Sequence, residues 1–131
     1  MNSPTTIARM SAEGRATIKL PWPNRVLHPN ERKHWAVKAK AAKKARQDGA
    51  AAAQIAGVRH IEADGLIVRV TAFPPNKHAR DDDGIMTNLK SYFDGIADVV
   101  GIDDSKWRMG EMERGEPVKH GAVHVEVEIV K

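Results

Sequence analysis

The residues best suited to chemistry in this sequence are aspartates gathered in two short groups. Three follow one another at Asp81, Asp82 and Asp83, and two more stand at Asp103 and Asp104. Adjacent carboxylates repel one another, so they cost stability unless an opposite charge offsets theirs. A hard divalent cation does this, because Mg²⁺ prefers oxygen ligands. In an extended loop, Asp81 and Asp83 could project to one side with Asp82 turned away, which indicates a metal site.

Each aspartate also has a structural interpretation. Asp83 could cap the helix that follows it, a role that contributes ~1 kcal/mol, and acid near a helix start favours the helix dipole. This explains one or two of the three adjacent aspartates. The second pair could belong to a helix stop followed by a capped turn. A calcium-binding EF-hand loop fits poorly, because it would place Ala79 and Lys90 at ligand positions.

Lys90 lies at the edge of the apolar face of a predicted helix, from which its ammonium could reach the acidic loop. There it would suit a scissile phosphate, although helices often carry lysine at this flank. The sequence contains no cysteine, so it has no thiolate metal site. Its six histidines include no H-x-H pair, and the one pair with H-x-x-x-H spacing, His120 and His124, falls at the predicted 121–130 strand. Neither a glycine-rich phosphate loop nor a GxSxG element is present, so we do not expect covalent nucleophilic catalysis.

The length and composition predict one domain. A chain of 131 residues buries enough surface for a single core, so we expect a flexible N-terminal extension at 1–14 and one domain at 15–131. No apolar run approaches the ~20 residues that span a bilayer. The beginning of the sequence lacks a secretory signal pattern. We therefore expect a cytoplasmic protein without membrane contact.

Hydrophobic periodicity predicts alternating strands and helices that would position these residues. We expect strands at 16–20, 65–73 and 121–130, a further short strand within 106–117, and helices at 31–55 and 85–100, the second closed by Gly101. The 16–20 strand should end at the prolines around Trp22. This order predicts an α+β fold, a two-layer domain with a mixed β-sheet and two main helices packed on it.

The long predicted helix has two different faces. Its apolar arc contains Val37, Ala41, Ala45, Ala52, Ile55 and Ala56. A neighbouring basic stripe, in a chain of net charge +4, contains Arg32, Lys33, Lys40, Lys43, Lys44 and Arg46. Such clustering suits a polyanion such as nucleic acid, and the alternative is a solvated helix face.

Taken in order, these features resemble the RusA-type Holliday junction resolvases, small endonucleases often carried by phages and prophages. The resemblance covers nearly the whole chain after Arg15. It rests on "LPWPN", the lysine-rich helix, the strand leading into "RDDD", the helix "LKSYFDGIAD", the turn "GIDD" and the final alternating strand. The order D-x-D, then lysine, then D-D is its most specific part.

The resemblance implies roles for individual residues. Asp81, Asp83 and Asp104 would be catalytic carboxylates that bind Mg²⁺, with Mn²⁺ as a substitute, and Lys90 would be the catalytic lysine. It also implies a homodimer that cuts branched DNA, chiefly four-way junctions, by paired phosphodiester hydrolysis. The residues that would hold DNA phosphates are Arg25, Lys33, Lys40, Lys44, Lys77 and Arg80.

One position departs from the family pattern. The family usually has asparagine directly after the second aspartate of the D-x-D element, and this chain has Gly84. A catalytically weakened branched-DNA binding protein with the same fold is therefore the alternative. A third interpretation, a magnesium-dependent enzyme acting on nucleotides or RNA, would leave the basic helix without a role.

Overall fold

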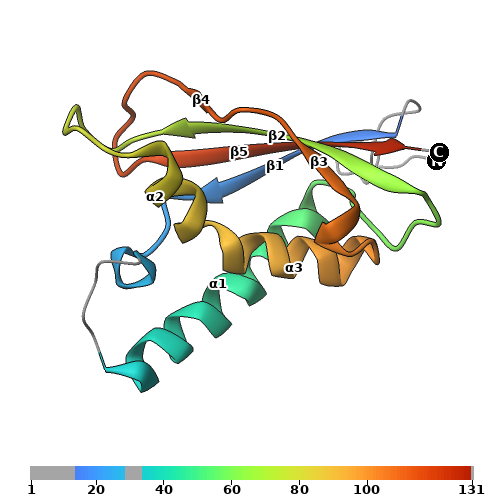
Figure 1. The fold of residues 1–131 in the computed structure, drawn as a ribbon, viewed down its shortest axis with the longest axis horizontal. Helices are drawn as coiled ribbons and strands as arrows, with labels where there is room; N and C mark the ends of the chain where they lie inside the picture. Colours follow the sequence, from blue (N-terminus) through green and yellow to red (C-terminus); the bar gives the residue numbers. More distant parts are fainter. Residues whose placement is uncertain (1–13, 29–33, 131) are drawn as a thin grey trace.

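The computed structural model describes residues 14–28 and 34–130. These residues form two layers, a five-stranded mixed β-sheet and a layer of helices beneath one face (Figure 1). The two-layer α+β fold predicted from the sequence is confirmed. In chain order the elements are β1 (Arg15–Pro21), the 3₁₀ helix η2 (Arg25–Leu27), α1 (Trp35–Ile55), β2 (Gly65–Phe73), α2 (Asp82–Asn88), α3 (Lys90–Val100), the 3₁₀ helix η3 (Asp104–Lys106), β3 (Trp107–Met109), β4 (Glu113–Arg114) and β5 (Ala122–Val130).

The sheet has the order β1-β5-β2-β3, and β4 also pairs with β2. β5 runs antiparallel to β1 and β2, whereas β3 and β4 run parallel to β2. Side chains alternate along each long strand, so one face meets the helices and the other meets solvent. The residues buried beneath the sheet are Ile18, Leu20, Leu66, Val68, Val70, Ala72, Val123, Val125 and Val127.

α1 and α3 cross closely because both carry glycine at the contact. A Cβ on Gly95 would collide with the carbonyl oxygen of Arg46, and one on Gly49 would collide with that of Tyr92. The buried line of α1 runs through Ala45, Gly49 and Ala53. Glycine and alanine let the two backbones approach, and a larger side chain would hold them apart.

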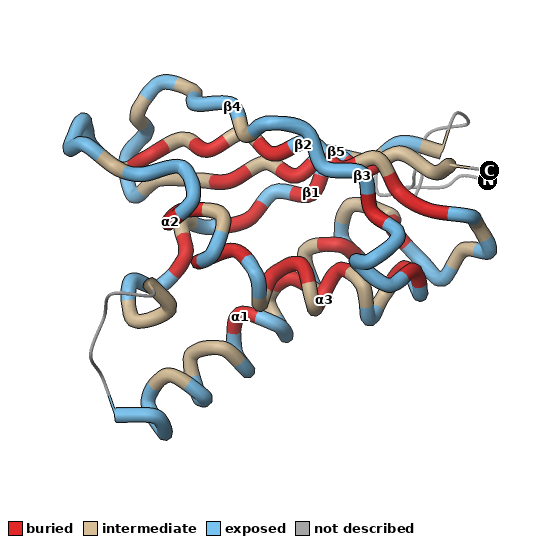
Figure 2. The backbone as a smooth tube through the Cα atoms, viewed as in Figure 1, coloured by how far each residue is buried: buried red, intermediate tan, exposed pale blue. Residues whose placement is uncertain are grey.

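The apolar face predicted for α1 is partly wrong. Val37 and Ile55 are 48% and 74% exposed, whereas Gly49 and Ala53, which the prediction omitted, are buried. The first turns of α1 extend beyond the sheet and are mostly exposed (Figure 2). The predicted and observed faces differ because α1 is buried along its later turns, at Ala45, Gly49 and Ala53. Small residues occur on several sides of these turns, so the sequence did not show which side is buried.

Several boundaries also differ from the prediction. The single helix expected at 85–100 is two helices, α2 and α3, that meet at Leu89 and begin earlier, at Asp82. The amide of Leu89 bonds to the carbonyl of Met86, three residues back, which tightens the chain there. Gly101 ends α3 with φ 77°, as expected. β1 continues to Pro21, the 106–117 region forms two short strands, and residues 1–13 and 29–33 lie outside the described part of the chain.

None of the helices in the described part of the chain combines the length and the apolar character that crossing a membrane requires.

Candidate functional site

The first acidic group lies where β2 leads into α2. Asp81 immediately precedes α2 in an extended conformation, while Asp82 and Asp83 already belong to its first turn, and all three are exposed. The predicted N-cap at Asp83 is therefore wrong by two positions, and the side chain of Asp81 makes no capping hydrogen bond. Because Asp82 and Asp83 are helical, the alternation expected of an extended loop does not apply to them.

Arg114 of β4 ties this acidic loop to the sheet. Its Nε donates a hydrogen bond to Asp82 Oδ1 at 2.7 Å, and its Nη2 donates to the carbonyl oxygen of Arg80 at 2.6 Å. Arg114 could not be predicted as a partner of Asp82 from the sequence, because it lies in a segment with weak periodicity. Asp82, to which the resemblance assigned no role, is therefore held by Arg114.

Lys90 joins the second acidic group to α3. Its ammonium donates to Asp104 Oδ2 at 2.7 Å and to Asp94 Oδ1 at 2.8 Å. Hydrogen bonding to Asp104, and next to Asp94, raises the pKa of Lys90 above its ordinary value, so the group stays charged at neutral pH. The structure therefore brings Lys90 to the second acidic group. Asp94 was missed, although its spacing of four residues from Lys90 is a known signal of a helical ion pair.

The two aspartates of the second group have different environments. Asp103 caps η3 by accepting a hydrogen bond from the amide of Ser105 at 3.1 Å. Hydrogen bonding from the side chain of Ser105, and next from its amide, lowers the pKa of Asp103. The indole of Trp107 donates to the carbonyl of Ile102 at 2.9 Å and anchors the turn in the core. The capped turn considered from the sequence is present, and it directs Asp104 to Lys90.

The expected metal ligands do not form one cluster. Among the residues that the structure describes, no three histidine, aspartate or glutamate side chains are arranged to hold a metal ion. Asp81 and Asp83 stand at the start of α2, whereas Asp104 is bound by Lys90. Carboxylate oxygens suit magnesium chemically, and in this structure the three carboxylates stand in two separate acidic groups. The role of Asp81, Asp83 and Asp104 as ligands stays a prediction from the resemblance.

The predicted DNA-binding residues that the structure describes lie on α1, in the loop after β2 and at one pocket. Lys40 and Lys44 are exposed on α1, and Lys44 forms an ion pair with Asp48 at 2.8 Å. Lys77 is exposed in the loop after β2. Arg25 and Arg80 line one pocket. Lys33 lies outside the described residues.

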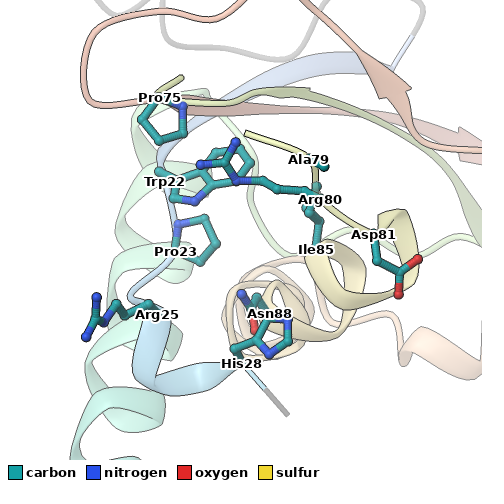
Figure 3. A pocket seen from close by; sticks show the side chains of 10 residues that line it. All are labelled: Trp22, Pro23, Arg25, His28, Pro75, Ala79, Arg80, Asp81, Ile85 and Asn88. Atoms are coloured by element: carbon teal, nitrogen blue, oxygen red, sulfur yellow. The ribbon is translucent and has the colours of Figure 1, made fainter. Parts of the chain in front are cut away.

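This pocket, named here the Trp22 pocket, has a volume of about 710 Å³. It lies between the end of β1, η2, the loop after β2, and α2 (Figure 3). Its walls are Trp22, Pro23, Arg25, His28, Pro75, Ala79, Arg80, Asp81, Ile85 and Asn88. The guanidinium of Arg80 lies over the Trp22 ring, 5.5 Å from the ring centroid. Sequence reasoning missed the pocket because its walls come from segments far apart in the chain.

Comparison with known proteins adds one relative. No protein family model matches the sequence. Over 94 residues the chain is 38% identical to a protein of Xylella fastidiosa (strain Temecula1 / ATCC 700964) that is described only as an uncharacterized protein. The match covers 70% of this chain and 61% of the relative, so it spans less than two thirds of the relative's length. The similarity therefore assigns no activity.

Proposed function

We propose that the protein is a magnesium-dependent, structure-selective endodeoxyribonuclease of the RusA type that resolves Holliday junctions. The observation that carries this proposal is the hydrogen bond between Lys90 and Asp104, 14 residues apart in the sequence. The resemblance selects these two residues as the catalytic lysine and a catalytic carboxylate. Their contact is what a shared site requires, and local sequence spacing alone does not produce it.

The side chains of the chain itself would perform defined tasks. Lys90 is positively charged, as a lysine is at neutral pH, and its raised pKa extends this charge to higher pH; it would stabilise negative charge growing on the phosphoryl oxygens. Lys40 and Lys77 are exposed and would hold DNA phosphates. A homodimer, implied by the resemblance, would place two such sites on opposing strands of a junction.

The second candidate is a branched-DNA binding protein that does not cleave. Two observations favour it. The carboxylates of Asp81, Asp83 and Asp104 do not form a metal-holding group in the described residues. Gly84 stands where the family usually has asparagine. Such a protein would have the same fold and basic surface but would not cleave phosphodiester bonds.

A labelled four-way junction, incubated with Mg²⁺, with Mn²⁺ or with a chelator, separates the two candidates. We expect paired symmetric nicks with either metal and none with the chelator. Asp81→Asn, Asp104→Asn and Lys90→Met should each reduce the cleavage rate by about 100-fold or more, the scale of losing a group that stabilises reacting charge. All three variants should still retard the junction in a gel.

Glu126→Gln is the matched control, because Glu126 is exposed on the sheet face opposite the helices. It should cleave like the wild type. A retarded complex without nicks under either metal would support the binding protein and reject the nuclease. Hydrolysis of RNA or free nucleotides in preference to junctions would reject both.

A further inference from the structure

We propose that the Trp22 pocket binds one unpaired nucleotide of a DNA strand, with the base stacked on Arg80 and its edge on the amide of Asn88. The inference rests on the proposed function in taking DNA as the ligand. It adds a base-binding site that neither the acidic groups nor the basic helix supplies.

Arg80 provides a rigid planar surface in this pocket. Its Nη1 donates to the carbonyl oxygens of Asn76 and His78, each at 3.1 Å, and its Nη2 donates to Asn76 Oδ1 at 2.8 Å. The Trp22 ring lies behind the guanidinium. Bases that leave a duplex stack on arginine planes and on aromatic rings, so a fixed arginine backed by an indole is a suitable platform.

Asn88 provides the group that would read the base. It is 9% exposed, it lines the pocket, and its Oδ1 is buried without any hydrogen-bond partner. A buried amide oxygen that lacks a partner disfavours folding, so such atoms are rare in folded proteins. A half-turn of the Asn88 amide would exchange its oxygen and nitrogen and present the oxygen to the pocket, where the N–H edge of an unpaired base could donate to it.

Charge and size also match a nucleotide. The volume of about 710 Å³ lies within the usual range of small-ligand pockets. Arg25 and Arg80 contribute positive charge beside an apolar wall that includes Pro23 and Pro75. A phosphate linked to the bound base would meet these arginines, whereas a neutral apolar ligand would leave them without a counterpart.

The position of the pocket links it to the acidic loop. Asp81, a predicted catalytic carboxylate, stands at its wall (Figure 3). A base held on Arg80 and Asn88 would therefore bring its own strand next to Asp81. The pocket would select an unpaired nucleotide beside the cleavage site, as extrusion of a base does in other DNA enzymes.

The test uses two 5′-phosphorylated single-stranded trinucleotides, one with three bases and one with an abasic central position. Each is titrated calorimetrically into the full-length protein with a chelator present, so that no cleavage occurs. We expect the complete trinucleotide to bind about tenfold more tightly than the abasic one, from stacking and pairing of the base. Asn88→Leu should reduce this preference, because it removes the pairing and leaves the stacking on Arg80.

The same variant distinguishes a reading group from a structural one. Because Asn88 Oδ1 has no partner, Asn88→Leu should keep or raise the melting temperature. Gln54→Leu, at an exposed amide near the end of α1, is the matched control and should keep the preference. Equal binding of the two trinucleotides, or an Asn88→Leu variant that keeps the preference, would overturn the inference.

The inference and the proposed function can fail separately. Junction cleavage by a protein that shows no preference for the complete trinucleotide would refute the pocket and leave the nuclease in place. Base-dependent binding that Asn88→Leu weakens, in a protein that never cleaves a junction, would support the pocket and refute the nuclease.

Discussion

Gly84 and His28 show how two single residues depend on each other. A Cβ on Gly84 would lie 3.0 Å from Nε2 of His28, closer than ordinary packing allows. Asparagine at this position, which is usual in the RusA-type resolvases that the sequence resembles, would require the imidazole of His28 to shift. His28 in turn forms part of the Trp22 pocket. The departure at Gly84 thus makes room for a histidine beside the acidic loop.

Tyr92 gives an alkaline pH dependence at the residue scale. Burial raises its pKa to about 12, with the charge of Asp48 acting in the same direction, and its hydroxyl donates to the carbonyl of Pro21 at 3.1 Å. In the unfolded chain the phenol ionises near pH ~10. Its contribution to stability is therefore complete below pH ~10 and is lost as the pH rises towards ~12.

We expect Tyr92→Phe to lose less stability than the wild type over this pH interval. The measurement is the free energy of urea unfolding at several pH values between ~8 and ~12. The variant should be less stable near neutrality by about 1 kcal/mol, because the hydrogen bond to Pro21 is absent. Parallel pH profiles for the two proteins would show that Tyr92 ionises alike in the folded and unfolded chains.

At the scale of elements, the crossing of α1 and α3 holds the helical layer together. Gly49 and Gly95 permit the close approach of the two helices. Arg46 adds a bidentate ion pair, in which its Nε donates to Asp98 Oδ2 at 2.6 Å and its Nη2 donates to Asp98 Oδ1 at 2.7 Å. The pair raises the pKa of Arg46 and lowers that of Asp98 through their hydrogen bonds. Both side chains are about half exposed, so we expect the ion pair to contribute little to stability.

Gly95→Ala should destabilise the protein by about 2 kcal/mol. Alanine favours a helix by up to ~1 kcal/mol over glycine, but its methyl group would collide with backbone atoms of α1, which cannot rotate away. Urea unfolding measures the change. Gly110→Ala is the control, since a Cβ there meets nothing within 4 Å. A Gly95→Ala variant as stable as the control would mean that the helices separate without cost.

At the scale of the whole molecule, the two faces of the sheet differ. The helical face carries the acidic loop, the ion pairs of Lys90 and the Trp22 pocket. The opposite face presents Thr17, Lys19, Arg69, Thr71, His124 and Glu126. The first turns of α1 project away from the sheet with exposed Lys40 (Figure 2). If DNA binds as proposed, it should approach from the helical side.

Salt dependence tests this orientation. The logarithm of the junction-binding constant should fall linearly with the logarithm of salt concentration, because bound phosphates release counterions. Lys40→Ala should reduce the magnitude of this slope by about 1, as loss of one phosphate contact does. Lys19→Ala removes the same charge from the opposite face and should leave the slope unchanged. Equal effects of the two variants would place the DNA elsewhere.

Features that depend on local periodicity could be predicted from the sequence. Strand β2 was predicted with its observed bounds, and β5 differs by one residue, because alternation of apolar side chains defines a half-buried strand. The apolar face of the helix predicted at 85–100 is likewise buried, at Leu89, Tyr92 and Ile96. The acidic groups and Lys90 could be identified because residue type and order carry that information.

Which side chains contact one another depends on the tertiary structure. The buried line of α1 depends on α3, since an alanine-rich helix offers several faces of nearly equal hydrophobicity. Asp82 pairs with Arg114 from a distant short strand, and Arg80 lies on Trp22 from the end of β1. Asn88 is left buried without a partner for its oxygen. These contacts join residues far apart in the chain, and their formation depends on packing between elements, which local periodicity does not encode.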